Sequence, residues 1–269
     1  PECARLLLRA GACVRLFIER GVDVDKVKTD TGASPLYMAS ANGKVECVHL
    51  LIEKGADVEK AQTDTGATPL FLASQNGHVE CARLLIEKGA DVDKARTKDG
   101  ATPLYIASQN DLVDCVHLLI EKGADVDKAR TDDGWTPLFV ASLNGHVKCA
   151  RLLIEKGAVV GKAQTDIGAT PLYVASENGH VECVQLLIEK GADLYIESHN
   201  GRVECVRTLM IEKDADVDKA RNDTGATPLY VASQNGHVDC VQLLIEKSAD
   251  VDKALIMASL NGTVDCAQL

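Results

Sequence analysis

The sequence predicts an all-α repeat solenoid, in which helix-turn-helix repeats stack and β-hairpin connectors, here called fingers, project between them. Two observations support this fold class. A near-identical block recurs every 34 residues, and a fixed period of this size is typical of stacked repeats. The chain is 46% apolar but only 3% aromatic, which suits a core of Leu, Ile, Val, Ala and Cys. The repeats open at Gly32, Gly66, Gly100, Gly134, Gly168 and Gly225.

The first helix of each repeat is expected directly after a Thr-Pro pair. In the repeat that opens at Gly66, Thr68 is the predicted N-cap and Pro69 the first helical residue, where the missing N–H costs nothing. Small residues such as Ala73 follow at helical spacing, where a second helix must come close. Asn76-Gly77 ends this short helix, because glycine allows a left-handed backbone at the C-terminal cap.

The second helix of the same repeat is expected from about His78 to Lys88. Its apolar residues cover more than half of the helix circumference, so it must be packed on several sides by its partner helix and by neighbouring repeats. Gly89 ends it. The polar stretch 90–99 is then the predicted finger, an extended excursion with a tight turn.

The chain departs from the regular pattern at both ends and once in the middle. After Gly191 a finger and its Thr-Pro start are absent, and Glu197 replaces a small alanine at a close-packed position, where an unpaired carboxylate is costly. This joint is predicted to be the weakest in the stack. The expected divisions are partial repeats at 1–31, regular repeats at 32–194, a truncated, fingerless repeat at 195–224, a regular repeat at 225–254 and a degenerate partial repeat at 255–269.

Charge and hydropathy exclude several kinds of partner. The formal net charge is −11 and the pI is near 5.1, which argues against nucleic acid and against an anionic membrane. No apolar run approaches the ~18 residues of a membrane span, and no signal peptide is visible. Pro1 and Leu269 both fall inside repeats, so we expect the chain to be an excerpt from a longer array.

Cysteine usage predicts reduced, buried thiols. Six of the ten cysteines stand 34 residues apart, so each occupies the same place in its own repeat. Stacked helices lie about 8–10 Å apart, whereas a disulfide needs Cα atoms within about 7 Å. Ten free thiols fit a cytosolic or nuclear setting. The six are Cys13, Cys47, Cys81, Cys115, Cys149 and Cys183.

No catalytic, metal or cofactor site is predicted. His78, Glu80 and Cys81 share a helix face, but they recur once per repeat along a rod, whereas zinc needs about four converging ligands. Buried cysteines are poor nucleophiles because burial raises the thiol pKa. The Gly-Ala-Thr-Pro turn lacks the glycine and lysine pattern of phosphate loops, and Asp-Val-Asp-Lys lacks the twelve-residue calcium pattern.

The recurring residues resemble the ankyrin repeat, and the resemblance covers nearly the whole chain. Two departures stand out. The family usually has His after Thr-Pro-Leu, where this chain has Tyr or Phe, and its period is about 33 rather than 34. The matching residues are Gly66, Thr68-Pro69-Leu70, Ala73, Asn76-Gly77-His78, Leu84-Leu85 and Gly89-Ala90-Asp91.

The resemblance implies a binding module whose fingertips and first helices line a concave groove. Positions that break the repeat pattern are therefore the candidate binding residues, and most fall in the repeats that open at Gly100 and Gly134. An aromatic anchor inside a polar rim is typical of a binding hot spot. Sequence drift in a loosely constrained array is the alternative. The candidates are Trp135, Leu143, Val159, Gly161 and Ile167, with the acidic pair Asp132 and Asp133.

The predicted function is non-catalytic protein binding, as a scaffold or adaptor. The expected partner is a protein with a basic patch, the expected state is a monomer, and the expected location is the cytoplasm or nucleus. One alternative is that the array is the recognition arm of a larger enzyme or channel whose active domain lies outside these residues. A second is a decaying array without a selected partner.

Overall fold

The computed structural model describes residues 20–29, 31–164, 168–192 and 226–261, together with positions 15, 203, 206, 207, 217 and 218. Every regular element among these residues is a helix. The chain divides into two compact blocks. The first block comprises residues 1–141 and 148–158, and the second comprises 142–147 and 159–269. Most of the predicted fingerless repeat at 195–224, with Glu197, lies outside the described residues.

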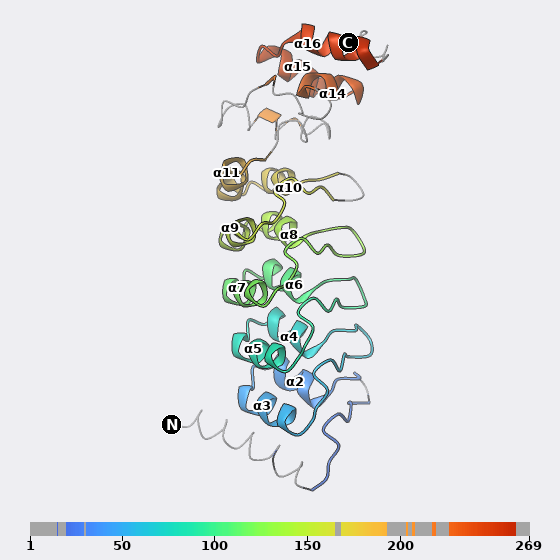
Figure 1. Ribbon diagram of the computed structural model, residues 1–269, viewed down its shortest axis with the longest axis vertical. Helices are drawn as coiled ribbons and strands as arrows, with labels where there is room; N and C mark the ends of the chain where they lie inside the picture. The colour runs from blue at the N-terminus through green and yellow to red at the C-terminus, as the bar shows by residue number, and fades with distance from the viewer. Residues whose placement is uncertain are drawn as a thin grey trace. The chain divides into compact units, whose positions relative to one another are not determined.

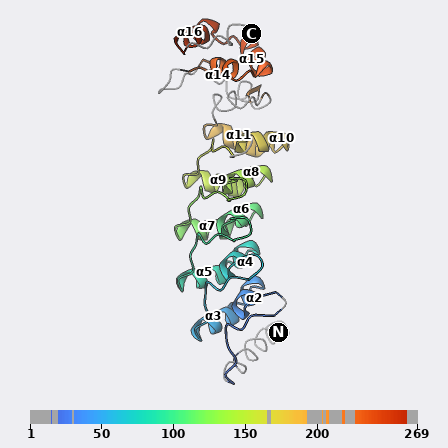
Figure 2. The ribbon, with the colours of Figure 1, turned by 90° about the vertical axis from the view of Figure 1, so that its right-hand side faces the viewer.

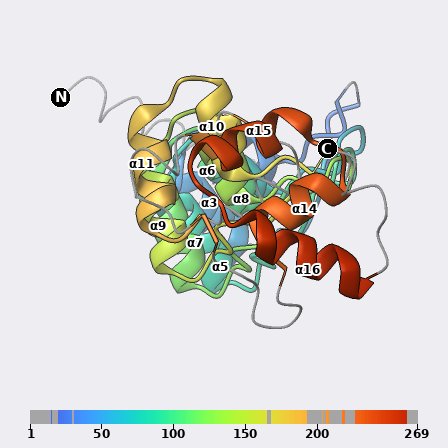
Figure 3. The ribbon, with the colours of Figure 1, turned by 90° about the horizontal axis from the view of Figure 1, so that it is seen from above.

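The first block is a stack of helix pairs (Figure 1). The two helices contact each other in the pairs α2–α3, α4–α5 and α6–α7, and equivalent helices of these successive pairs also touch, as α2 touches α4 and α5 touches α7. Figure 2 shows the pairs as successive layers, and in Figure 3 α5 and α7 overlap along the stack. The helices are α2 (Pro35–Ala41), α3 (Val45–Glu53), α4 (Pro69–Gln75), α5 (Val79–Glu87), α6 (Pro103–Gln109), α7 (Val113–Glu121), α8 (Pro137–Leu143) and α9 (Val147–Glu155), of which α8 and α9 reach into residues of the second block.

The second block repeats the pairing with fewer described helices. A last helix, α16 (Val251–Asn261), packs against α14 and runs without a break through Ala254, where the sequence divides the last regular repeat from the partial one. The other helices are α10 (Pro171–Glu177), α11 (Val181–Glu189), α14 (Pro228–Gln234) and α15 (Val238–Glu246).

The first helices begin where the sequence predicts. The Thr68 hydroxyl accepts a hydrogen bond of 3.2 Å from the Phe71 main-chain N–H, and Pro69 takes the first helical position. Ser34, Thr102, Thr136, Thr170 and Thr227 cap their helices in the same way. A side-chain cap typically stabilises a helix by about 1 kcal/mol, which matters for helices of only seven residues.

Left-handed residues separate the two helices of each repeat, and packing reinforces the choice of glycine. Gly43 has φ +63°, and a side chain there would begin 2.6 Å from Nδ1 of His78 in the next repeat. In the turn between α6 and α7 the equivalent position holds Asp111, which is also left-handed, with φ 55°. The following residue there is Leu112, which replaces the histidine and packs against Gly77.

The core runs between the two helix layers. Leu36, Leu70, Leu104 and Leu138 of the first helices are completely buried, and Cys81, Ala82 and Leu85 show the same burial on α5. The small serine that follows the core alanine is also buried, as at Ser74. Ala73 is completely buried as well, and α4 contacts α5, as expected for small residues on the first helix.

The connectors leave the first block on one side and return, as Figure 1 shows. In the connector 89–102 the Arg96 N–H donates to the Ala101 carbonyl at 2.9 Å, and the Gly100 N–H donates to the Arg96 carbonyl at 2.8 Å. These bonds close a tight turn. No strand forms in the described connectors, so their expected β character is not shown, and the fingers are turn-closed loops.

Candidate protein-binding face

An apolar cluster lies at the base of the fingers in the first block. Partly buried side chains pack against a buried centre, so the cluster reaches the surface at its edges. The centre contains Ala67, Phe71, Ala101, Tyr105, Ile106 and Val140, and the partly buried members are Tyr37, Leu72 and Trp135.

Arginines from the fingers cover the aromatic rings of this cluster. The Arg96 guanidinium carbon lies 4.7 Å from the Phe71 ring centroid. That of Arg130 lies 5.3 Å from Tyr105 and 5.7 Å from Trp135. Cation–π contacts of this kind contribute about 0.5–2 kcal/mol each, more where water is excluded. The fingers and the first helices are therefore joined by specific contacts.

Carboxylates at the finger turns neutralise both arginines. Asp99 forms a bidentate pair with Arg96 and lies 3.9 Å from Arg130. Asp133 accepts a hydrogen bond of 2.9 Å from Arg130, and Asp132 lies 3.7 Å from the same guanidinium. Asp132 and Asp133, predicted as candidate partner-binding residues, thus pair with an arginine of the chain itself; the Asp133 side chain is 17% exposed and that of Asp132 is 48% exposed.

Two pKa values record this environment. Burial works to raise the pKa of Asp99, but hydrogen bonds from Arg96 and from the Ala101 N–H, with the charges of Arg96 and Arg130, lower it below its usual value. Burial raises the pKa of Tyr105 to about 12, against the opposing charge of Arg130. At neutral pH Asp99 is an anion and Tyr105 is a neutral phenol.

Trp135 is half-buried. Its ring lies 5.0 Å from that of Phe139 at a tilt of 38°, and its main-chain N–H donates to Asp133 at 3.0 Å. Its indole N–H is buried and has no hydrogen-bond partner, and the same holds for Nε of Arg130. The only tryptophan is therefore packed into the cluster at the edge of the face, and its role as a binding anchor stays a prediction.

Carboxylates also link successive fingers through main-chain hydrogen bonds. The Asp57 N–H donates to Asp25 at 3.1 Å, the Asp91 N–H to Glu59 at 2.7 Å, and the Asp125 N–H to Asp93 at 3.2 Å. We call this set the finger ladder. Each bond spans 32 residues of sequence, so the ladder fixes each finger against the next.

The remaining predicted site residues do not join this cluster. Leu143, Val159 and Gly161 belong to the second block, and Ile167 lies outside the described residues. Val159 is 53% exposed and Leu143 is half-buried. Gly161 stands where other repeats carry an acceptor carboxylate of the finger ladder, so its divergence removes that acceptor side chain. Val159 stands where Asp57, Asp91 and Asp125 donate their main-chain N–H groups, so it replaces a carboxylate but no acceptor of the ladder.

Sequence reasoning missed the residues that hold this face together. Arg96, Arg130 and Asp99 did not stand out as binding candidates, and neither did Tyr37 or Leu72. One signal was present in the sequence. The repeats with Arg96 and Arg130, where the preceding repeat has Gln62, are also the only ones that end their finger on aspartate, at Asp99 and Asp133.

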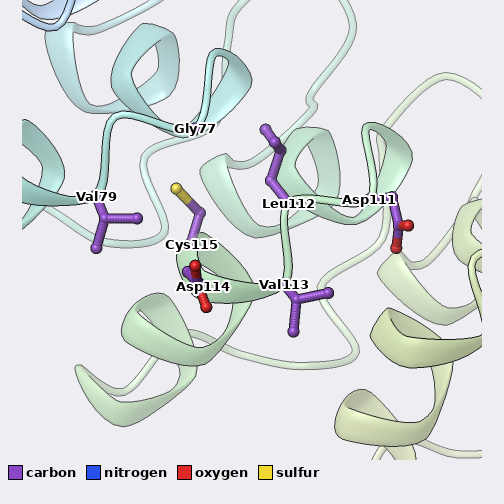
Figure 4. Close-up of a pocket in the computed structure, with 7 residues that line it drawn as sticks. All are labelled: Gly77, Val79, Asp111, Leu112, Val113, Asp114 and Cys115. Carbon is purple, nitrogen blue, oxygen red and sulfur yellow. The ribbon is translucent and has the colours of Figure 1, made fainter.

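A separate pocket of about 240 Å³ lies beside the start of α7 (Figure 4). It is lined by Gly77, Val79 and residues 111–115. In Figure 4 the Cys115 sulfur points toward Gly77, whereas the Asp111 carboxylate points away from Cys115. Burial raises the pKa of Cys115 to about 11, so the thiol is protonated at neutral pH and is a poor nucleophile.

The described cysteines are free and buried, which confirms the prediction at those positions. They are Cys47, Cys81, Cys115, Cys149, Cys183 and Cys240. Burial raises the pKa of Cys81 to about 11 and that of Cys149 further, the latter also through a hydrogen bond to Asp111. Within the described ranges, no group of three or more His, Cys, Asp or Glu side chains is placed to hold a metal ion.

The comparison with protein families decides the family. A family model described as ankyrin repeats (3 copies) matches residues 2–62, 59–130, 127–198 and 194–269, which together cover almost the whole chain. The chain belongs to the ankyrin repeat family. No curated protein matches it. Ankyrin repeats are generally protein–protein interaction modules, so the finger and first-helix face is the surface to consider for function.

The family match includes the stretch after Gly191, where the sequence departs from the regular repeat pattern. The family match extends over 194–269, although a finger is missing from the sequence after Gly191. Of the helices in the described part of the chain, none is both long and apolar enough to cross a membrane.

Proposed function

We propose that this chain is a non-catalytic scaffold or adaptor that binds another protein through its fingertips and the exposed face of its first helices. The observation that best supports this proposal is the finger ladder. Because Asp25, Glu59 and Asp93 hold the next finger by main-chain hydrogen bonds, the face is ordered before a partner arrives. A pre-ordered face binds with a smaller entropic cost.

The charge of the chain supports a partner with a basic patch. The net charge is −11, and the finger 57–65 carries three acidic residues, Asp57, Glu59 and Asp64, against one lysine. Complementary charge of this kind accelerates association and disfavours acidic competitors. The reduced thiols support a cytosolic or nuclear setting. A monomer is the proposed state.

The experiment that tests the function is affinity capture with the intact chain, followed by direct binding measurements with the captured protein. We expect a partner whose affinity falls as salt rises, because exposed charge pairs are screened. The informative variant replaces residues 134–167 with a copy of 66–99. This exchange keeps the repeat length and core but removes Trp135, Leu143, Val159, Gly161 and Ile167 together.

The matched control replaces residues 100–133 with a copy of 66–99, which leaves the divergent repeat in place and keeps arginine at position 130 and aspartate at position 133. Loss of binding in the first variant and retention in the control would place the divergent positions in the interface. Unchanged affinity in both folded variants would remove those positions from the site. A folded chain that captures no specific protein contradicts the proposed function.

A further inference from the structure

The turns between the two helices of a repeat hold the preceding repeat through polar side chains. His78 Nε2 lies 3.2 Å from the Ala41 carbonyl oxygen, and His180 Nε2 lies 2.9 Å from that of Leu143. Each of these carbonyls stands at the end of the preceding first helix, where carbonyls have no partner within the helix. The histidine that follows the turn glycine therefore ties its repeat to the one before.

The turn between α6 and α7 departs from this arrangement at two consecutive positions. Leu112 replaces the histidine, so its side chain has no N–H to give to the Gln75 carbonyl oxygen, which accepts from Asn110 Nδ2 at 2.9 Å. Asp111 replaces the glycine, and its carboxylate is hydrogen-bonded to the thiol of Cys149 in the following repeat. This turn therefore lacks one tie to the preceding repeat and has an added tie to the following one.

The pocket of about 240 Å³ lies at the place of the missing tie. Its lining comes from Gly77 and Val79, at the turn before α5, and from residues 111–115, at the start of α7. Leu112 is the side chain that approaches Gly77 most closely, at the position where His78 approaches Gly43 in the preceding junction. The two turns are therefore incompletely packed against each other at this junction.

The fingers of the same two repeats are joined by three hydrogen bonds. The Asp91 N–H donates to Glu59 at 2.7 Å. The Lys98 N–H and the Thr97 hydroxyl both donate to the Thr65 carbonyl oxygen, at 3.1 and 3.2 Å. Fingers and turns lie at opposite ends of the helix pairs, because the chain enters each pair from a finger, reverses at the turn and leaves by the next finger. One edge of the junction is thus held and the opposite edge is not filled.

We propose that the first block flexes at the junction between the pairs α4–α5 and α6–α7, opening on the turn side about a hinge formed by the fingers. A repeat stack is held only by contacts between neighbours, so it bends where those contacts are fewest. The motion widens the pocket while the three finger hydrogen bonds stay closed. It tilts α4 relative to α6 and so changes the curvature of the face that the first helices line. This joint is a conformational property of the fold, beyond the proposed binding function.

Two cysteines report on the opening with matched chemistry. Cys115 lines the pocket, and its sulfur points toward Gly77 (Figure 4). Cys81 holds the equivalent position one repeat earlier, where His78 supplies the tie. Both thiols are buried, and burial raises the pKa of each to about 11. A difference in their reactivity therefore reports access and not the fraction of thiolate.

The test treats the whole native chain with N-ethylmaleimide and locates the modified cysteines by mass spectrometry of its peptides. We expect Cys115 to react about fivefold faster than Cys81, because opening at its junction breaks one hydrogen bond fewer. Leu112→His restores the donor and should slow Cys115 to the rate of Cys81. His78→Leu is the reciprocal variant and should speed Cys81 to the rate of Cys115. Circular dichroism checks the folding of both variants.

Amide hydrogen exchange followed by NMR separates a hinge from complete separation of the two repeats. Leu112→His should leave the exchange of the Asp91 and Lys98 amides unchanged, because the finger bonds stay closed in either chain. If these amides become protected in parallel with Cys115, the junction separates as a whole and the hinge is overturned. Equal reaction rates of Cys81 and Cys115 in the native chain, or rates that neither substitution changes, overturn the joint itself.

Discussion

At the scale of single residues, the face is built from charges that satisfy one another. Arg130 contacts two aromatic rings and three carboxylates, those of Asp99, Asp132 and Asp133. Its side chain is only 20% exposed, so these interactions are screened by water less than surface ion pairs are. Side chains that appear acidic and exposed in the sequence are therefore partly structural.

Asp99 should make stability depend on pH. Its pKa is lower in the folded chain than the ordinary value near 3.9, so its stabilising contribution is present above that value and is lost as pH falls through the folded pKa. Asp99→Asn should lower the free energy of unfolding by about 1.5–3 kcal/mol at pH 7. Urea denaturation at pH 7 measures the change.

The same comparison at pH 3 provides the check on cause. At pH 3 the Asp99 carboxyl of the unfolded chain is largely protonated, so part of the advantage of the charged form in the folded chain is lost, and the two chains should differ less there than at pH 7. Asp64→Asn, at an exposed position of another finger, is the control and should change stability by less than about 0.5 kcal/mol. An equal loss at both pH values would contradict the electrostatic explanation.

At the scale of elements, each first helix depends on its cap and on close packing. A helix of seven residues is too short to be stable alone, so the Thr68-type caps and the small residues at the helix contact decide whether it forms. The serines buried at the contact between the two helices differ in whether their hydroxyl groups are hydrogen-bonded. Ser74 Oγ has no hydrogen-bond partner, whereas Ser108 Oγ donates to the Leu104 carbonyl at 2.8 Å.

Ser74→Ala should therefore stabilise the chain by about 1 kcal/mol, because it removes an unsatisfied buried hydroxyl and favours the helix. Ser108→Ala is the matched control, since it removes a satisfied hydroxyl from the same position of the next repeat. It should be neutral or destabilising. Thermal unfolding of the two variants measures the difference, and equal shifts would mean that the hydrogen bond is not what distinguishes them.

At the scale of the whole molecule, stability in a repeat array is set by contacts between neighbours, so one poor junction weakens the chain locally. The sequence places that junction after Gly191, where a finger is absent and Glu197 replaces alanine. Positions 193–202 lie outside the described residues, and the weak joint stays a prediction.

Hydrogen exchange tests this prediction directly. Amides of 192–214 should exchange before those of α4 to α7, because buried helix amides open only with larger unfolding. Glu197→Ala restores the residue that regular repeats carry and should raise protection in 192–214. Ala175→Glu places the same charge in a regular repeat as a control and should create a second weak junction. Uniform exchange across the chain would contradict a local weakness.

Local sequence alone determined the repeat period, the helix boundaries and the buried free cysteines at the described positions, because caps, glycine turns and apolar spacing act over a few residues. Thr68, Gly77 and Cys81 could each be interpreted from their own repeat. The tertiary structure alone decided that Trp135 is half-buried under Arg130, that Asp99 joins two fingers and that Glu59 holds the Asp91 N–H. These contacts depend on where side chains of neighbouring repeats point once the repeats are stacked, and the sequence pattern of a single repeat does not specify that.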